Sequence, residues 1–536
     1  MRPRSLLSQV SRKLSGQGPA APVSRRTQRA LLAERTVRSV LELAVRVGET
    51  LLSLGAAATD VTEGIRRVCR AFGIECAVDL TFTSILVVHD GGDDSPGVSV
   101  LRVVEVRTAD YERLARVTAL LHDLTEGPRE VQQVSDLLDD AEARDTARHD
   151  VEDAHARLDA ILVEPHRYRR GVVTLVLAVM AAGVALLLGG GPLVVVLAAA
   201  TTALIDTATR ALHRWGLPPF FQQIAGAVIA TSVAVGLLAL LPSLPVEFAS
   251  LPPSLVVASG IVVLLAGMSL VGAADDAING FPLTASGRLL EVVLLTLGIV
   301  IGIGAVLDVG RTLGVELVLV DSYARPWPAA VQVLGAALAA GAWAVSSHAP
   351  PRAALVAAAA GAGAWLGYDT LTSLGSAPLV ASAAPALVLG LVGEWLGDRT
   401  RVPAGVTTVC GIVPLLPGLM IYQGVLDLTS ETPDAGGTQQ LLQAGMVGVG
   451  LAGGVTLGRI LYRRLRTPVA VVTRPVRNRR RRVRGASTTF GTAVLTDALV
   501  EQIDAQPEVL VEETTPDVPA PTDDGTGQGT WVRADD

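Results

Sequence analysis

Apolar and polar positions follow a helical rhythm over the first part of the chain. From Arg29 to Thr50, apolar residues recur every three or four positions with arginines and glutamates between them, which predicts an amphipathic helix. A second helix is predicted from Asp60 to Arg70, with Gly73 as its stop, because glycine is favoured after helix C-termini. Residues 111–124 and 131–163 return to the same spacing, and the second of these stretches is long and highly charged.

Between these helices the pattern changes to that of β-strands. Residues 77–89 and 98–107 are rich in β-branched residues, and the stretch 90–97 between them has the composition of a turn. The two segments together predict a β-hairpin. Residues 29–165 are therefore expected to form a small α+β cytoplasmic domain with a helical stalk.

Beyond Arg170 the apolar runs become long enough to cross a bilayer, for which about 20 residues are needed. We count ten such runs. The expected spans are 171–189, 192–209, 220–241, 254–273, 289–307, 328–346, 352–368, 378–396, 403–426 and 440–461.

The placement of arginine predicts the orientation of these spans. Arginines precede the first span, follow the second, fourth, sixth and eighth, and close the tenth, whereas the intervening loops carry almost none. Because short cytoplasmic loops are enriched in basic residues, both termini are expected in the cytoplasm. Residues 1–28 are basic, contain no apolar run of signal-peptide length, and are expected to be disordered.

Charge separates the middle of the chain from its flanks. Residues 171–458 hold eight basic and 14 acidic side chains, and the remaining charges lie on either side. Residues 467–485 form a basic juxtamembrane segment suited to anionic headgroups, and residues 486–536 form an acidic tail expected to be disordered. This division excludes a single soluble globule and a nucleic-acid binder built on a basic domain.

An internal repeat is visible in two of the predicted spans. Residues 260–276 align with residues 411–427 without a gap, and seven of the seventeen positions are identical. The aligned segments belong to the fourth and ninth spans, so the repeat unit is five spans, 166–325 and 326–466. Because five is odd, consecutive units must enter the bilayer from opposite sides. The expected fold is a mostly α membrane protein of ten transmembrane helices in two inverted five-helix repeats, preceded by the α+β domain.

Helix-breaking residues mark a candidate site within the repeat. Pro417 and Gly418 interrupt the ninth span, and Gly267 stands at the equivalent place in the fourth. Interrupted backbone inside a membrane is tolerated only against protein or a water-filled cavity, so these residues are candidates for a substrate pathway. The alternative is that the prolines and glycines only kink their helices.

Four carboxylates within or at the ends of spans are candidates for a substrate or proton pathway. An acidic side chain in the bilayer is costly unless it is paired or hydrated, and one that can take up a proton suits transport coupled to a proton gradient. The repeat places Asp276 and Asp427 at equivalent positions, and Asp206 and Glu394 have apolar sequence beside them. The alternative is that each of them caps or anchors its helix at the headgroup level.

Signals for enzymatic chemistry are absent from the sequence. It contains no Walker loop, nucleophile elbow or zinc motif, and we expect no cofactor and no metal. His149 and His155 share a helix with the wrong spacing for metal ligands, so they are expected to lie on a solvated face of the stalk.

Several motifs resemble the threonine/serine exporter family in its actinobacterial form. The stretches LLSLGAAATDVTEGIRRVCRAFGI, VDLTFTSILV and LRVVEVRTADYERLARV are similar to the family's cytoplasmic region, and TVCGIVPLLPG to its C-terminal half. Relatives have a glutamate where this chain has Thr62, with Glu63 beside it. The resemblance covers residues 35–465 and implies export of threonine and serine, driven by the proton-motive force.

The leading hypothesis is therefore a secondary exporter of threonine, serine or similar small amino acids in the cell membrane. The 165 soluble residues leave open a membrane-anchored sensor or scaffold that acts through its N-terminal domain. A channel is a third alternative. The sequence leaves the oligomeric state open, including a homo-oligomer.

Overall fold

The computed structural model describes nine stretches of the chain and is mostly helical. These are residues 25–90, 97–104, 109–126, 141–240, 253–265, 267–314, 327–399, 404–429 and 436–466. The expectations for the disordered N-terminus up to residue 24, the basic segment 467–485 and the acidic tail 486–536 lie outside the described residues.

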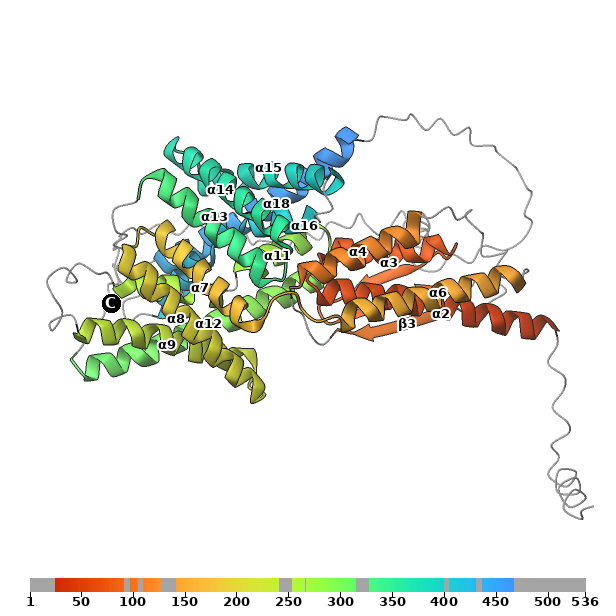
Figure 1. The fold of residues 1–536 in the computed structure, drawn as a ribbon, viewed down its shortest axis with the longest axis horizontal. Coiled ribbons are helices and arrows are strands. Elements are labelled where there is room, and N and C mark those ends of the chain that lie inside the picture. The colour runs from red at the N-terminus through yellow and green to blue at the C-terminus, as the bar shows by residue number, and fades with distance from the viewer. Residues whose placement is uncertain are drawn as a thin grey trace, which may run out of the picture. The chain divides into compact units, whose positions relative to one another are not determined.

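The N-terminal elements form a small α+β domain, drawn in red to orange in Figure 1. Its helices are α2 (Arg25–Ser53), α3 (Ala58–Ala71), α4 (Tyr111–Glu126) and α6 (Ala141–Val163). Helix α2 contacts the other three helices as well as the sheet, because its apolar stripe, with Leu41, Ala44 and Val45 fully buried, forms the centre of the core. The α+β domain that the sequence predicts is present.

The sheet of this domain has three strands instead of the two expected. Strands β1 (Ala77–Leu80), β2 (Ser84–His89) and β3 (Val98–Val103) pair antiparallel in the order β1-β2-β3. The first predicted strand is divided by the turn Thr81–Thr83, where the Thr81 hydroxyl accepts a bond from the Ser84 backbone N–H at 3.1 Å. The predicted hairpin is present as β2 and β3. The additional strand β1 was missed because this polar turn lies inside a continuous β-like pattern.

Glycines end the first two helices as the sequence predicts. Gly55 and Gly73 have φ values of 93° and 70°, in the left-handed region that other residues rarely adopt. Gly73 donates its backbone N–H to the Arg70 carbonyl at 2.9 Å and so closes the last turn of α3.

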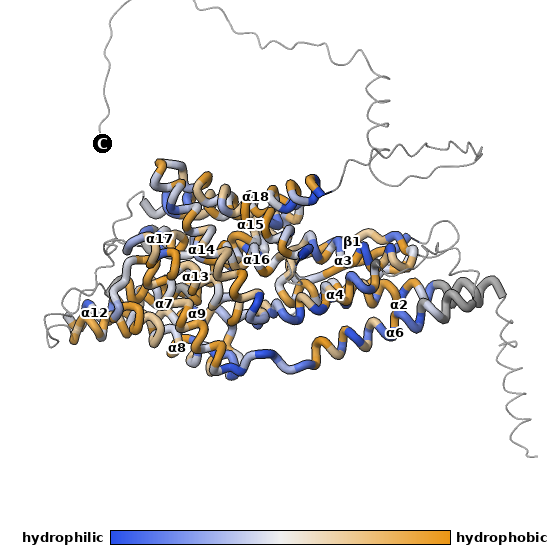
Figure 2. Tube along the Cα trace, turned by 45° about the horizontal axis from the view of Figure 1, so that its top comes forward, coloured by the Kyte–Doolittle hydropathy of each residue, from blue (hydrophilic) through white to orange (hydrophobic). Residues whose placement is uncertain are grey.

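The remaining helices form an apolar bundle, and Figure 2 colours them mostly as hydrophobic, whereas α2 and α6 carry long hydrophilic stretches. Seven described helices are long and apolar enough to cross a membrane. They are α7 (Arg170–Leu187), α8 (Pro192–Arg214), α9 (Pro219–Leu240), α12 (Pro282–Thr312), α13 (Ala329–Ser346), α15 (Pro378–Arg399) and α18 (Gly436–Arg466). The other three expected spans correspond to α14 (Pro351–Ser373) and to two interrupted helices described below.

Helix lengths in the first half of the bundle recur in the same order in the second. Helices α7 and α13 both have 18 residues, α8 and α14 both have 23, α9 and α15 both have 22, and α12 and α18 both have 31. Corresponding neighbours also pack alike, with α9 against α12 and α15 against α18. This agreement in length extends over four pairs of helices, far beyond the seventeen aligned residues from which the repeat was inferred.

Glycine rows hold these long helices close together. A Cβ added at Gly302 would lie 2.5 Å from the Ile224 carbonyl oxygen, and one added at Gly450 would lie 2.9 Å from the Leu379 carbonyl oxygen. Such distances leave no space for a side chain, so the glycines are packing positions. Gly298, Gly454 and Gly458 are in the same situation.

Candidate functional site

Two helices of the bundle are interrupted at equivalent places. The first consists of α10 (Pro253–Ile261), a 3₁₀ turn at Val262–Leu264 and α11 (Gly267–Ile278). The second consists of α16 (Ala404–Gly411), a 3₁₀ turn at Val413–Leu415 and α17 (Gly418–Thr429). In the second helix, Pro414 and Pro417 cause the break, because proline lacks a backbone N–H and clashes with the preceding turn.

The two breaks lie against each other, and their contacts are reciprocal. A Cβ added at Gly267 would lie 3.1 Å from Leu416 Cβ, and one added at Gly418 would lie 2.9 Å from Leu265 Cβ. In the alignment of the repeat, Gly267 corresponds to Gly418 and Leu265 to Leu416. Aligned segments therefore exchange aligned contacts. We call this contact the crossing.

The crossing is closed in this structure. Gly267 is buried, and the leucine of each break covers the glycine of the other. An apolar cluster of Leu177, Met180, Ala342 and Val413 from α7, α13 and the second break fills the space beside it.

Asp276 is the most buried of the four candidate carboxylates. Its residue is 2% exposed, and its Oδ2 lies 3.0 Å from Nε of Arg288 on α12. Gly272, one turn earlier on α11, leaves the space that the Arg288 guanidinium occupies. A buried charge pair of this kind is held by its surroundings, since loss of either partner leaves an uncompensated charge.

Asp275, the neighbour of Asp276, has a partner on α18. The Thr456 hydroxyl on α18 donates to Oδ1 of Asp275 at 2.8 Å. About one turn further along α18, Arg459 donates to the Thr408 hydroxyl of α16 at 3.2 Å. We call Asp275, Asp276 and Arg288 the α11 charge cluster, which holds two carboxylates and one guanidinium group.

The other three candidate carboxylates are placed differently. Asp206 pairs with Arg210 on its own helix at 2.7 Å, and Glu394 pairs with Arg463 of α18 at 3.5 Å. Asp427 is half-buried near the end of α17. Asp276 and Asp427 each follow the glycine that starts their helix by nine residues, about 14 Å along the axis, so neither carboxylate lies at the crossing. Pro417, Gly418 and Gly267 do meet there.

An apolar groove of about 600 Å³ lies between α14 and α15. Gly363 and Gly367 of α14 and Pro385 of α15 line it. The corresponding positions of α8, counted from the start of the helix, are Leu204 and Ala208, and Leu204 is exposed.

The N-terminal domain contacts the bundle through residues that the sequence did not single out. Tyr111, the first residue of α4, is 4% exposed and belongs to one apolar cluster with Trp343 and Cys410 of the bundle. Its backbone N–H donates to the Ser347 carbonyl at 2.9 Å. The preceding Asp110 is 3% exposed and accepts from the Arg113 backbone N–H at 3.0 Å, as a helix N-cap does. The N-cap is visible in the sequence, but its position beside Ser347 is not.

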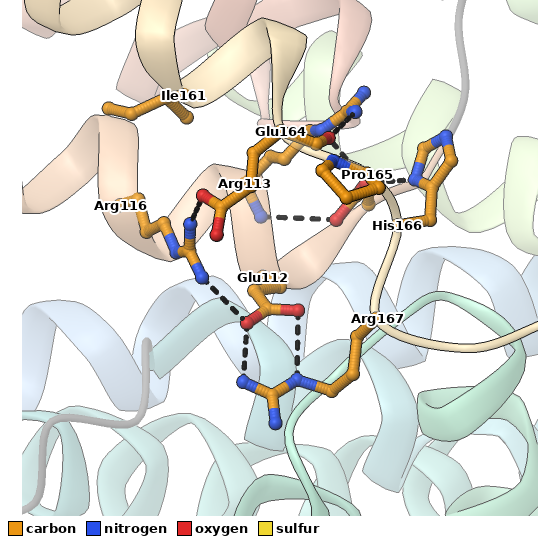
Figure 3. A pocket seen from close by; sticks show the side chains of 9 residues that line it. Glu112, Arg113, Arg116, Ile161, Glu164, Pro165, His166 and Arg167 are labelled. Carbon is orange, nitrogen blue, oxygen red and sulfur yellow. Dashed lines mark hydrogen bonds and ion pairs between the residues drawn. The ribbon is translucent and has the colours of Figure 1, made fainter.

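Charged residues surround this contact, as Figure 3 shows. Glu112 accepts two bonds from Arg167, at 2.9 and 2.5 Å, and one from Arg116 at 3.0 Å. The bonds from Arg167 lower the pKa of Glu112 below its ordinary value. Glu164 pairs with Arg116, so the connector between α6 and α7 is tied to α4.

Two histidines complete the junction on the side of the bundle. His166 lies 3.0 Å from Oδ2 of Asp110, and its ring stacks on His348 with centroids 4.6 Å apart. His348 joins α13 to α14 with φ at 61°, and burial lowers its pKa. Tyr168 donates its hydroxyl to the Ala349 carbonyl at 3.0 Å, so the connector also contacts this turn.

A small soluble domain, seven helices long enough to cross a bilayer and two interrupted helices that meet at their breaks define a multi-pass membrane protein. Residues 42–149 and 130–310 match a family model for threonine/serine exporters, and residues 332–461 match a second model described as "Threonine/Serine exporter, ThrE". The chain belongs to the threonine/serine exporter family.

Two curated relatives resemble the chain over most of their length. One, from Mycobacterium tuberculosis (strain ATCC 25618 / H37Rv), is named "Probable threonine/serine exporter" and is 37% identical over 467 residues, which cover 84% of this chain and 82% of the relative. The other, from Corynebacterium glutamicum, is named "Threonine/serine exporter" and is 32% identical over 459 residues, 84% of this chain and 86% of the relative. No solved structure matches the chain.

Proposed function

We propose that this protein exports threonine and serine across the cytoplasmic membrane as a secondary transporter driven by the proton-motive force. The observation that carries the proposal is the reciprocal contact of two interrupted helices, Gly267 against Leu416 and Gly418 against Leu265. Transporters place interrupted helices of this kind at the interface of two repeats that move against each other. The names of the two curated relatives supply the substrates.

The proposed topology has ten spans in two inverted repeats, with both termini in the cytoplasm. Two observations support it. Helix lengths recur in order, and both interrupted helices break at aligned residues. Because the proposed repeat has five spans, an odd number, its two copies would enter the bilayer from opposite sides. The interrupted helices and α14 supply the three spans beyond the seven long apolar helices.

Movement of the two repeats about the crossing gives alternating access. Separation of Leu265 from Gly418 and of Leu416 from Gly267 opens a path on one side at a time. The α11 charge cluster then offers the Arg288 guanidinium group to the substrate's carboxylate and its own carboxylates to the substrate's ammonium group. Asp276 is our candidate for the proton carrier, because Arg288 can bind the carboxylate of a substrate in place of the carboxylate of Asp276.

The test is threonine efflux from cells loaded with a threonine-containing dipeptide. We expect deletion of the gene to reduce efflux, and the wild-type chain to restore it. A Gly418→Val variant should not restore efflux, because a larger side chain cannot fit against Leu265. Unchanged efflux after deletion would contradict the substrate assignment.

A further inference from the structure

Two charged side chains of the bundle have no partner of opposite charge among the described residues. Asp275 on α11 is half-buried and accepts from the Thr456 hydroxyl at 2.8 Å and from the Asn279 amide at 3.1 Å. Arg459 on α18 is half-buried and donates to the Thr408 hydroxyl at 3.2 Å. Its Nε is buried and has no hydrogen-bond partner in the described part of the chain. Each charge is therefore held by neutral groups only.

Neighbouring charges on the same two helices are paired. Asp276 on α11 binds Arg288 at 3.0 Å. One turn beyond Arg459 on α18, Arg463 reaches Glu394 of α15 at 3.5 Å. A charge that is partly removed from water is stabilised by a partner of opposite sign, and two such partners are missing here.

The two unpaired charges lie close to each other along α18. Thr456, which binds Asp275, precedes Arg459 by three residues, so both side chains leave the same face of α18, about 4.5 Å apart along its axis. Beside them, Val271 of α11 and Val455 of α18 belong to one apolar cluster. An α-amino acid carries its ammonium and carboxylate groups on a single carbon, so it can bridge a carboxylate and a guanidinium group placed in this way.

We propose that Asp275 and Arg459 form the position at which the substrate first binds, with its ammonium group on Asp275 and its carboxylate on Arg459. We call this pair the loading site. The inference rests on the proposed function, because it assigns residues to a zwitterionic substrate. In the proposed topology, Arg459 lies near the cytoplasmic end of α18, where a substrate for export enters.

The loading site differs from Arg288 in what it requires. Arg288 must leave Asp276 to bind a carboxylate, whereas Arg459 binds one without the loss of an ion pair. Asp275 belongs to the first repeat and Arg459 to the second. Movement of the repeats therefore changes the separation of the two charges and releases the substrate.

Binding of threonine and two analogues to the purified full-length protein tests the loading site. Threoninol has a hydroxymethyl group in place of the carboxylate, and N-acetylthreonine has a neutral amide in place of the ammonium group. The rise of the melting temperature with ligand concentration reports each affinity. We expect wild type to bind either analogue at least tenfold more weakly than threonine, because a charge-assisted contact is lost.

Two variants assign the two ends of the ligand. Arg459→Gln should lose the preference for threonine over threoninol and keep the preference over N-acetylthreonine. Asp275→Asn, which keeps an acceptor for Thr456, should show the converse. Arg463→Gln is the matched control, because it removes an exposed guanidinium group one turn away, and it should leave all three affinities unchanged.

An Arg459→Gln variant that still prefers threonine to threoninol tenfold would overturn the loading site, as would an Asp275→Asn variant that still rejects N-acetylthreonine. Should Arg459→Gln fail to fold, Thr408→Val removes the hydroxyl that positions Arg459. It should weaken threonine binding and leave threoninol binding unchanged, and equal affinity of Thr408→Val and wild type for threonine would overturn the loading site. Wild type that binds no threonine at all would contradict the proposed function itself.

Discussion

At the scale of single residues, the Asp276–Arg288 pair is the most informative feature. Its two side chains are 2% and 19% exposed, so neither charge is solvated by water to any large extent. The aligned repeat made Asp276 a candidate from the sequence. Arg288 entered the sequence analysis only as one of the arginines that indicate which loops are cytoplasmic. In the structure the two residues form a buried ion pair.

The pair predicts a non-additive response to mutation. Arg288→Met should destabilise the protein by about 3–5 kcal/mol, because it leaves a buried carboxylate without its partner. The double variant Asp276→Asn/Arg288→Met should recover a large part of that loss. Thermal unfolding in detergent measures both. If the double variant is less stable than Arg288→Met, the two residues do not act as a pair.

Tyr111 predicts a second residue-scale effect. Replacement by Ala should cost about 3–5 kcal/mol, because a fully packed aromatic ring is removed from the contact between the domain and the bundle. Tyr111→Phe, the matched control, keeps the ring and should cost far less. Limited proteolysis of α4 reports the contact directly. Equal protection of Tyr111→Ala and wild type would contradict the role of Tyr111 as the anchor.

His348 predicts how the junction depends on pH. Burial lowers its pKa from 6.5, so the folded protein disfavours the protonated ring, although the nearby Asp110 opposes this effect. The stability that the neutral ring contributes is present above pH 6.5 and is lost as the pH falls below it. Glu112, whose pKa is lowered from 4.5 by Arg167, adds a loss only at still lower pH.

The variant His348→Asn separates the two groups. Asparagine tolerates the left-handed backbone at this position and does not titrate. We expect the variant to flatten the decrease in melting temperature between pH 7 and 5, and to leave the decrease below pH 4.5 in place. A wild-type decrease between pH 7 and 5 that persists in His348→Asn would assign the effect to another group.

At the scale of elements, the sequence predicted where helices lie along the chain better than it predicted which elements contact each other. Apolar run lengths located the seven described helices that are long and apolar enough to cross a membrane, and Gly73 ended its helix as expected. The turn Thr81–Thr83 was missed because its threonines and phenylalanine also suit a strand. The alignment of residues 260–276 with 411–427 identified both breaks, but sequence alone cannot show that they touch. That contact joins residues 149 and 153 positions apart, Gly267 with Leu416 and Leu265 with Gly418.

Two glycines of α14 provide an element-scale prediction with a built-in control. A Cβ at Gly361 would overlap Cβ of Ala340 on α13, whereas a Cβ at Gly363 meets nothing within 4 Å because it faces the groove. Gly361→Ala should therefore lower the melting temperature. Gly363→Ala should leave it unchanged or raise it, since alanine favours a helix by about 1 kcal/mol over glycine. A higher melting temperature for Gly361→Ala together with a lower one for Gly363→Ala would contradict the packing of α13 on α14.

At the scale of the whole molecule, an N-terminal α+β domain and a bundle of apolar helices share one chain. The domain contacts the bundle through Tyr111 and through Phe82 against Gly287 of α12, and Glu112 ties it to Arg167 in the connector before α7. The sequence alone left open a separate sensor or scaffold that acts through this domain. The anchor and the contact with α12 could not be predicted from sequence, because each joins residues about 200 or more positions apart.

Transport in proteoliposomes tests the central claim most directly. The purified full-length protein is reconstituted, a proton gradient is imposed, and labelled threonine is followed. We predict accumulation of threonine against its concentration gradient, which stops when a protonophore collapses the proton gradient. Threonine that only equilibrates across the membrane, as through a channel, or that does not cross it at all, would contradict the account.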